Sequence, residues 1–193
     1  MQIEYNENSI NEELLFSFLK YTDDEFTPSL SSRVNLENYA KKMCDNAYLF
    51  EAFYNNELIA LVAMYANDII SKKAYITYVY CKKEYRKLGI ANQLIKNAFK
   101  KLEEINFKSC SLEVSVDNIP AINLYSKFNF IITKKQQEKS LKTIMQAVLG
   151  GGGYLSGFIT DFFLFCYLCT RNIFPCARSA VKWVKKLFYE CCN

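Results

Sequence analysis

Residues Ala74 to Ala91 read AYITYVYCKKEYRKLGIA, and this stretch decides the fold. Its first half, Ala74 to Cys81, is aromatic, β-branched and apolar, which is typical of a strand. Gly89, the single glycine before residue 150, lies where the strand gives way to a helix. The first backbone N–H groups of a helix lack internal partners and the helix dipole adds partial positive charge, so this junction can bind an anion.

The segment Arg86-Lys87-Leu88-Gly89-Ile90-Ala91 therefore has the properties of a pyrophosphate-binding loop. Backbone amides from Lys87 through Ala91 would face the phosphates, and Arg86 and Lys87 would add positive charge. Glycine lets an anion approach the backbone closely. The alternative interpretation is an ordinary turn in which Gly89 only permits a sharp bend, because short motifs also occur by chance.

The rest of the first 146 residues alternates helical and strand patterns. Ser9 and Glu12 have the spacing of a capping box, which predicts the start of a first helix. Hydrophobic periodicity then predicts the order ααβββαβαββ, an α/β sheet with helices on its faces. The expected helices cover 10–20, 36–44, 91–105 and 120–128, and the expected strands cover 48–54, 58–66, 74–81, 110–116, 130–133 and 141–146.

Two segments resemble the signature motifs of the GNAT acetyltransferase superfamily. Glu84 to Ala91, EYRKLGIA, is similar to the R/Q-x-x-G-x-G/A motif. Asn118 to Phe130, NIPAINLYSKFNF, is similar to N-x-x-A-x-x-L-Y-x-K-x-G-F, with Asn129 where the family usually has glycine. Asparagine tolerates a left-handed conformation, so the helix can still end there. The resemblance covers residues 1–146 and implies a GNAT-like mixed central sheet flanked by helices.

The resemblance also implies roles for individual residues. Acetyl-CoA is the expected co-substrate, with Tyr125 as the general acid that protonates the departing thiolate. A phenol with an ordinary pKa of about 10 is a proton donor at neutral pH, although a core tyrosine would show the same helical spacing. The expected contacts to the pantetheine arm come from Val79, Tyr80, Cys81 and Asn118, and those to the pyrophosphate from Arg86, Lys87, Leu88, Gly89, Ile90 and Ala91.

The general base has no clear position in the sequence. Many family members carry a glutamate on the strand before the phosphate loop, but Ala74 to Cys81 contains no carboxylate. Glu51, Asp68 or Glu113 could act through water, or the amine could arrive deprotonated. The acceptor is expected over the first two helices and their loop, where Phe26 and Arg33 are candidate contacts and Arg33 is alternatively a solvated loop residue.

Composition narrows the function further. The chain has no histidine, which excludes Ser-His-Asp and Cys-His catalysis and histidine metal sites. The segment after residue 146 carries five basic and two acidic residues, which give +3 of the net charge of +4. The first 146 residues are therefore nearly neutral and lack the excess of positive charge that is typical of nucleic-acid binding. The N-terminus lacks the pattern of a signal peptide, which predicts a cytoplasmic protein.

Residues 147–153 form a predicted glycine-rich linker, and residues 154–193 a hydrophobic, cysteine-rich C-terminal extension. Tyr154 to Cys169 is almost wholly apolar, and the segment from Val181 to Phe188 has the pattern of a basic amphipathic helix. This tail could bind a membrane surface, pack on the domain or a partner, or be an accidental extension. Cys166-x-x-Cys169 could begin a zinc site, but the other cysteines are irregularly spaced, so we expect no metal.

The sequence thus predicts an N-acetyltransferase that transfers an acetyl group from acetyl-CoA to a primary amine of a small molecule or peptide. Two alternatives are a non-catalytic acyl-CoA-binding or sensing domain and a membrane-anchored scaffold that works through its tail. The oligomeric state and the acceptor cannot be read from the sequence.

Overall fold

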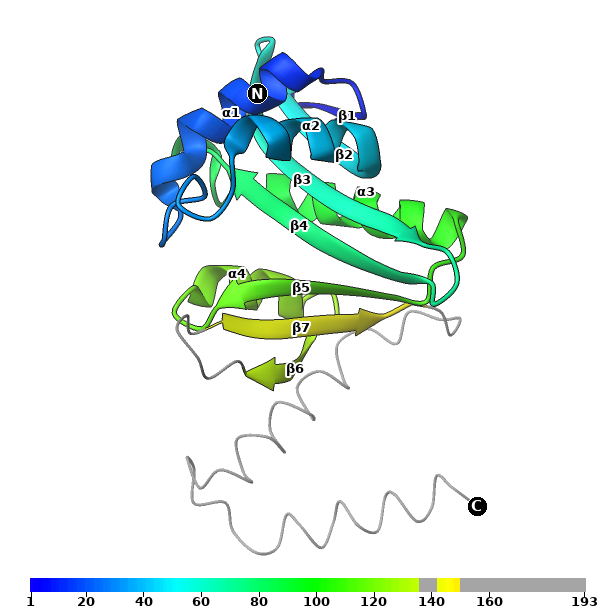
Figure 1. The fold of residues 1–193 in the computed structure, drawn as a ribbon. Helices are drawn as coiled ribbons and strands as arrows, with labels where there is room; N and C mark the ends of the chain where they lie inside the picture. The colour runs from blue at the N-terminus through cyan, green and yellow to red at the C-terminus, as the bar shows by residue number, and fades with distance from the viewer. Residues whose placement is uncertain (136–141, 150–193) are drawn as a thin grey trace, which may run out of the picture. The chain divides into compact units, whose positions relative to one another are not determined.

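The computed structural model describes residues 1–135 and 142–149 (Figure 1). These residues form a seven-stranded mixed sheet in the order β1-β2-β3-β4-β5-β7-β6, with helices on both faces. The strands are β1 (Glu4–Glu7), β2 (Ala47–Tyr54), β3 (Glu57–Asp68), β4 (Lys73–Cys81), β5 (Ser109–Ser115), β6 (Ile131–Lys135) and β7 (Lys142–Val148). The α-helices are α1 (Glu12–Thr22), α2 (Leu36–Asn46), α3 (Ile90–Glu104) and α4 (Ile119–Ser126), and the 3-10 turns are η1 (Asp23–Glu25) and η2 (Lys83–Tyr85).

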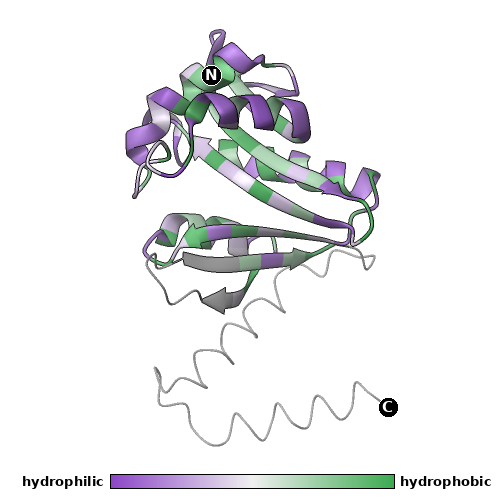
Figure 2. Cartoon of the chain, viewed as in Figure 1, coloured by the Kyte–Doolittle hydropathy of each residue, from purple (hydrophilic) through white to green (hydrophobic). Residues whose placement is uncertain are grey.

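Two hydrophobic clusters cover the two faces of the sheet. One joins α3 and α4 to the sheet and includes Leu94, Leu112 and Tyr125. The other joins α1 and α2 to the opposite face and includes Leu15 and Met43. The central strand β3 is buried along most of its length and is largely hydrophobic in Figure 2, whereas the outer sides of α1 and α2 are mostly hydrophilic. The predicted mixed sheet flanked by helices is confirmed.

The start of α1 differs from the expected capping box. Asn11 is the N-cap, and its side chain accepts a hydrogen bond from the backbone N–H of Leu14 at 2.9 Å. Ser9 instead donates from its backbone N–H and its hydroxyl to the carboxylate of Glu51, at 3.1 and 3.2 Å. The prediction of a capping box between Ser9 and Glu12 was wrong, because Ser9 donates its hydrogen bonds to Glu51, a buried residue of β2 that is distant in sequence.

The strand order contains one element that the sequence analysis did not predict. Glu4–Glu7 forms β1, an edge strand antiparallel to β2. All four of its side chains are exposed, so it carries no hydrophobic alternation from which a strand could be recognised. Its backbone pairing with β2 is therefore a tertiary effect.

At the other end of the domain, β7 runs beyond the expected limit at residue 146. Ala147 is buried and pairs with Cys110 on β5, and the backbone N–H of Leu149 donates to Lys108 at 2.6 Å. The first compact unit of the chain is Met1–Gly151. We propose placing the domain boundary after Leu149, because a boundary at Gln146 would remove the last residues of a core strand.

The predicted linker beyond Leu149 and the tail at 154–193 lie outside the described residues. Among the residues that are described, no helix is long and apolar enough to cross a membrane. The membrane-binding, packing and accidental interpretations of the tail therefore stay predictions.

Candidate active site

The candidate site begins where β4 and β5 separate. These two strands pair in parallel only from Lys73 with Ser109 to Ile76 with Leu112, and Figure 1 shows them diverging beyond that point. The residues of β4 from Thr77 to Cys81 remain paired with β3 on one edge. Within the described residues no strand pairs with their other edge, so its backbone N–H and C=O groups face the space toward β5 and can bind an extended ligand arm.

A β-bulge lies at the point of separation. In the pairing of β3 with β4, Ala63 faces Tyr78 and Met64 faces Ile76, so Thr77 is the extra residue. Before the bulge Ile76 packs with the α3 cluster, and after it Tyr78 packs with the α1 and α2 cluster. After the bulge, the residues of β4 that would have faced one side of the sheet therefore face the other. Bulges are frequent beside active sites because they redirect side chains in this way.

The predicted phosphate loop has the geometry of an anion-binding helix start. Gly89 is the N-cap of α3, with φ +80° and ψ 3°, and Lys87 also has a positive φ of 66°. A Cβ at residue 89 would meet no atom within 4 Å, so the left-handed backbone conformation, and not a lack of space, favours glycine there. The first turn of this 15-residue helix contains no acidic side chain, which keeps the positive end of its dipole available to an anion.

Arg86 is held beside this loop by three contacts. Its Nε donates to the carbonyl oxygen of Cys81 at 2.9 Å, its guanidinium lies 5.5 Å from the centre of the Tyr80 ring, and one terminal nitrogen lies 3.5 Å from Glu25. Glu25 also binds the ammonium group of Lys83 at 2.6 Å. The loop that follows α1 is therefore tied to the phosphate loop by one carboxylate.

Helix α4 supplies the second predicted motif. The side-chain oxygen of Asn118 caps the helix by accepting from the backbone N–H of Ala121 at 3.2 Å, so a bond to a ligand would have to come from its amide nitrogen. Tyr125 lies in the last turn, is 6% exposed, and shares a cluster with Ile90 at the start of α3 and Val114 on β5. Burial raises the pKa of the Tyr125 phenol, so it stays protonated through the neutral range.

The face of the sheet under α2 carries a second group of polar side chains. Tyr39 of α2 shares a hydrogen bond of 2.7 Å with the hydroxyl of Thr77, the bulge residue. Tyr75 lies nearby on β4, and burial followed by the charge of Glu113 raises its pKa to about 12. The sequence analysis named Glu113 but missed Tyr39, Tyr75 and Thr77, because no local pattern distinguishes them from other strand and helix residues.

The three candidate carboxylates have different surroundings. Glu51 is fully buried against Ser9, away from the bulge. Asp68 ends β3 and accepts from Ser71 in the turn at the opposite end of β4. Glu113 lies on β5, one position past the last residue paired with β4, and its charge acts on Tyr75. Of the three, only Glu113 is next to the point where the strands separate.

The two predicted acceptor contacts lie on the α1 and α2 side. Phe26 is half-buried, with its ring 5.5 Å from that of Tyr78 and 6.1 Å from that of Tyr80. Arg33 is exposed, and its charge offsets only part of the rise in the pKa of Tyr39 and of Tyr75 that burial causes. These two residues therefore border the same face as Thr77.

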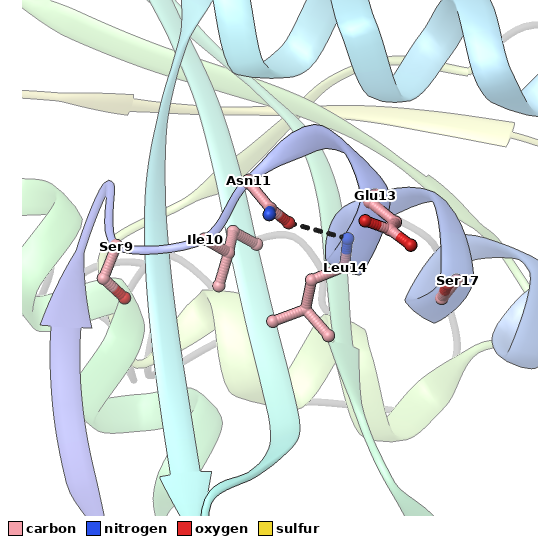
Figure 3. A pocket seen from close by; sticks show the side chains of 6 residues that line it. All are labelled: Ser9, Ile10, Asn11, Glu13, Leu14 and Ser17. Atoms are coloured by element: carbon pink, nitrogen blue, oxygen red, sulfur yellow. Dashed lines mark hydrogen bonds between the residues drawn. The ribbon is translucent and has the colours of Figure 1, made fainter.

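Two surface hollows lie elsewhere. One, of about 430 Å³, is lined by residues at the start and outer side of α1, namely Ser9, Ile10, Asn11, Glu13, Leu14 and Ser17 (Figure 3). The second, of about 410 Å³, adjoins it between α1 and the turn after β2. Neither contains a residue of the phosphate loop, α4 or the bulge.

Comparison with known proteins agrees with this geometry. Residues 9–130 match the family described as "Acetyltransferase (GNAT) family". The chain belongs to the GNAT acetyltransferase family. The match covers well over half of the chain and includes both motifs and every element from α1 to α4, so the family resemblance inferred from the sequence is confirmed.

Among related sequences, an "N-alpha-acetyltransferase" of Sulfurisphaera tokodaii is 40% identical over 60 residues, which cover 31% of this chain and 36% of that protein. The match thus spans little more than a third of that relative. Among solved structures, Arabidopsis thaliana NAA60 in complex with a bisubstrate analogue has a TM-score of 0.64 at 20% identity, covering 78% of this chain and all of that one. The PaiA N-acetyltransferase of Thermoplasma acidophilum in complex with coenzyme A has a TM-score of 0.59 at 18% identity, covering 77% and 100%. At these identities the structures establish the fold.

Proposed function

We propose that this protein is an acyl-CoA-dependent N-acetyltransferase that transfers the acetyl group of acetyl-CoA to the α-amino group of a polypeptide. Family membership supports acetyl transfer. A structural neighbour crystallised with coenzyme A supports the donor, and relatives called N-alpha-acetyltransferases support the acceptor class. The observation that carries the proposal is the separation of β4 from β5 at the Thr77 bulge, on the strand that leads into the helix start at Gly89.

The donor is proposed to lie along the exposed edge of β4. The amides at Lys87 to Ala91 receive the pyrophosphate, aided by the charges of Arg86 and Lys87. The pantetheine arm adds to the sheet through the backbone of Val79, Tyr80 and Cys81 and reaches Asn118. An extended arm that pairs with backbone groups satisfies polar atoms that would otherwise need water.

The acceptor amine approaches from the α1 and α2 face, bordered by Phe26 and Arg33. Its nitrogen attacks the thioester carbonyl carbon, so a C–N bond forms and the carbonyl oxygen takes up the electron pair. The collapse of this tetrahedral intermediate breaks the C–S bond. Tyr125 donates its proton to the departing thiolate, which leaves coenzyme A as the thiol, and the tyrosinate then takes up a proton from solvent before the next turnover.

The amine must also lose a proton, and we assign this step to Glu113. Its position at the separation of the strands and its electrostatic effect on Tyr75 support this role over Glu51 and Asp68. Glu113 acts through water or directly, as a general base whose proton later passes to solvent. Burial and then the charge of Glu113 raise the pKa of Tyr75 to about 12, so Tyr75 stays protonated beside it.

The test is an assay of thiol release from acetyl-CoA by the full chain with a matched peptide panel. Peptides with a free N-terminus, the same peptides with a blocked N-terminus and an internal lysine, and free amino acids and polyamines should be compared. Turnover only with the free N-termini is expected. Turnover confined to lysine side chains or small amines would overturn the acceptor class, and tight acetyl-CoA binding with no turnover on any amine would favour the sensing alternative.

A further inference from the structure

The end of the sheet away from the candidate active site exposes three aliphatic side chains. Ile69 and Ile70 lie in the turn between β3 and β4 and are 68% and 94% exposed, and Val148 at the end of β7 is 75% exposed. Figure 1 shows that this turn, the end of α3, the start of β5 and the end of β7 meet at one end of the domain. Isoleucine at a turn tip has no role in the core, so its exposure needs another explanation.

Three lysines belong to the same end of the sheet, and the ammonium group of Lys72 lies 5.4 Å from the centre of the Phe107 ring. The carbonyl oxygen of Lys72 accepts from the backbone N–H of Lys108 at 2.8 Å, and Lys73 is adjacent to Ser109 in the pairing of β4 with β5. We name Ile69, Ile70, Lys72, Lys73, Lys108 and Val148 the distal surface. Three strands and a turn hold it in place, so its apolar and basic groups are presented together.

Nearby acidic groups are engaged in local contacts. Both oxygens of Asp68 accept from Ser71, the backbone N–H at 2.9 Å and the hydroxyl more closely. Glu104, in the last turn of α3, pairs with Lys101 at 3.5 Å. Asp68 stays negatively charged near Lys73, but the three lysines of the distal surface outnumber it, so an excess of positive charge remains around the hydrophobic tip.

The chain also leaves the domain at this surface. The backbone N–H of Leu149 donates to the carbonyl oxygen of Lys108, and the glycine-rich segment starts at the next residue. The sequence that follows contains the apolar stretch Tyr154 to Cys169 and the basic segment Val181 to Phe188. Two regions with the same combination of apolar and basic residues are thus joined directly at Leu149.

We propose that the distal surface docks on an anionic lipid bilayer, with Ile69 and Ile70 inserted among the headgroups and the lysines paired with lipid phosphates. Exposed aliphatic residues gain by entering the interface, and each lysine near an anionic surface strengthens partition about fivefold. A nucleic acid would use the lysines but would leave the isoleucines in water. The combination of both groups therefore favours lipid.

This orientation directs the active site away from the bilayer. β4 spans nine residues from Lys73 to Cys81, which at about 3.3 Å a residue places the end of β4 that leads into the phosphate loop roughly 25–30 Å from the docked end. The openings for acetyl-CoA and for the acceptor stay in water. The inference concerns a surface that the proposed reaction does not use, so it stands independently of the acceptor.

The test places a tryptophan at the tip of the full chain. Trp183 is the single tryptophan, so Ile70→Trp in a Trp183→Phe background reports on the tip alone. With vesicles of phosphatidylcholine and phosphatidylserine, its fluorescence should shift to the blue and be quenched by lipids with a doxyl group on the acyl chain. Leu14→Trp in the same background, on the outer side of α1, should do neither.

A second pair of variants tests the charge. Lys73→Glu/Lys108→Glu should lower partition to these vesicles by at least about tenfold, whereas Lys20→Glu/Lys41→Glu on α1 and α2 should change it little. Co-sedimentation without quenching at residue 70 would mean that the tail alone binds lipid and would overturn the proposal. Failure to bind vesicles, or a blue shift that grows with protein concentration without lipid, would also overturn it.

Discussion

Glu25 and Arg86 form an ion pair at 3.5 Å that joins the loop after α1 to the phosphate loop before α3. The proposed acetyl-CoA site requires the guanidinium of Arg86 for the pyrophosphate, so the donor must compete with Glu25 or share Arg86 with it. Glu25 also binds Lys83 at 2.6 Å, and it lies in the loop after α1, next to the proposed acceptor site. Binding of the donor is therefore linked to this loop.

Glu25→Gln should therefore tighten acetyl-CoA binding by about two- to fivefold at low salt, since an exposed ion pair of this kind is weak and is screened by salt. Calorimetric titration at low and high salt measures the effect, which should shrink as salt rises. Glu7→Gln is the matched control, because Glu7 pairs at 2.7 Å with Lys101 in the last turn of α3, at the far end of that helix from the loop. Weaker binding in Glu25→Gln alone would indicate that Glu25 orders the loop and does not compete.

Gly89→Asp should weaken acetyl-CoA binding far more than Gly89→Asn. The two side chains have the same shape and both tolerate the positive φ of residue 89 better than other residues do, so the difference isolates the negative charge placed at the phosphate. We expect at least a tenfold larger loss for aspartate, or about 1.4 kcal/mol. Equal affinities of the two folded variants for acetyl-CoA would show that its phosphates do not bind at this helix start.

Tyr125→Phe should lower kcat about a hundredfold while changing acetyl-CoA affinity little, because the hydroxyl acts only as charge develops on the leaving sulfur. Steady-state kinetics and direct titration give the two quantities. Tyr48→Phe is the control, since Tyr48 is a half-buried tyrosine that packs on the same core cluster. Parallel losses of kcat and affinity in Tyr125→Phe would identify a structural or binding residue.

Glu113→Gln should lower kcat/KM at neutral pH by at least about tenfold, in line with the loss of a general base. The ratio of the variant to the wild type should approach one as pH rises, because the amine then arrives already deprotonated. Asp68→Asn, at the opposite end of β4, should leave the whole profile unchanged. A constant ratio across pH would show that Glu113 holds the acceptor and does not accept its proton.

Glu51 should make the stability of the fold depend on pH in a defined window. Burial raises its pKa from 4.5 to about 6, although the hydrogen bonds from Ser9 lower it. Between about pH 4.5 and pH 6 the folded state therefore binds more protons than the unfolded state. Glu51 favours the folded state most below pH 4.5, and this stabilisation is lost as pH rises through 6.

Denaturant unfolding of the wild type and of Glu51→Gln at a series of pH values isolates this contribution. The wild type should lose at most about 2 kcal/mol more than the variant between pH 4.5 and 7. A difference between the two proteins that does not change with pH would mean that Glu51 has the same pKa in the folded and unfolded chains.

Short-range patterns in the sequence determined most of the elements. The periodicity of residues 91–105 and the apolar run at 74–81 predicted α3 and β4 closely, because a helix or strand that packs on one face must repeat its apolar residues with a fixed period. The motif around Gly89 likewise predicted a strand, a tight turn and a helix start. These features depend on residues adjacent in sequence, so the sequence alone carries them.

Contacts between distant residues decided the remainder. The bulge at Thr77 arises from the pairing of β3 with β4, and Ser9 leaves its expected cap because Glu51 is buried beside it. Glu113 is distinguished from Glu51 and Asp68 by its position where β4 and β5 separate and by its neighbour Tyr75. Strand register and the desolvation of a carboxylate depend on which segments pack together, and no local window contains that information. The sequence by itself determined the glycine at the start of α3, where we propose that the pyrophosphate binds, and the tertiary structure decided which side chains lie around the proposed site.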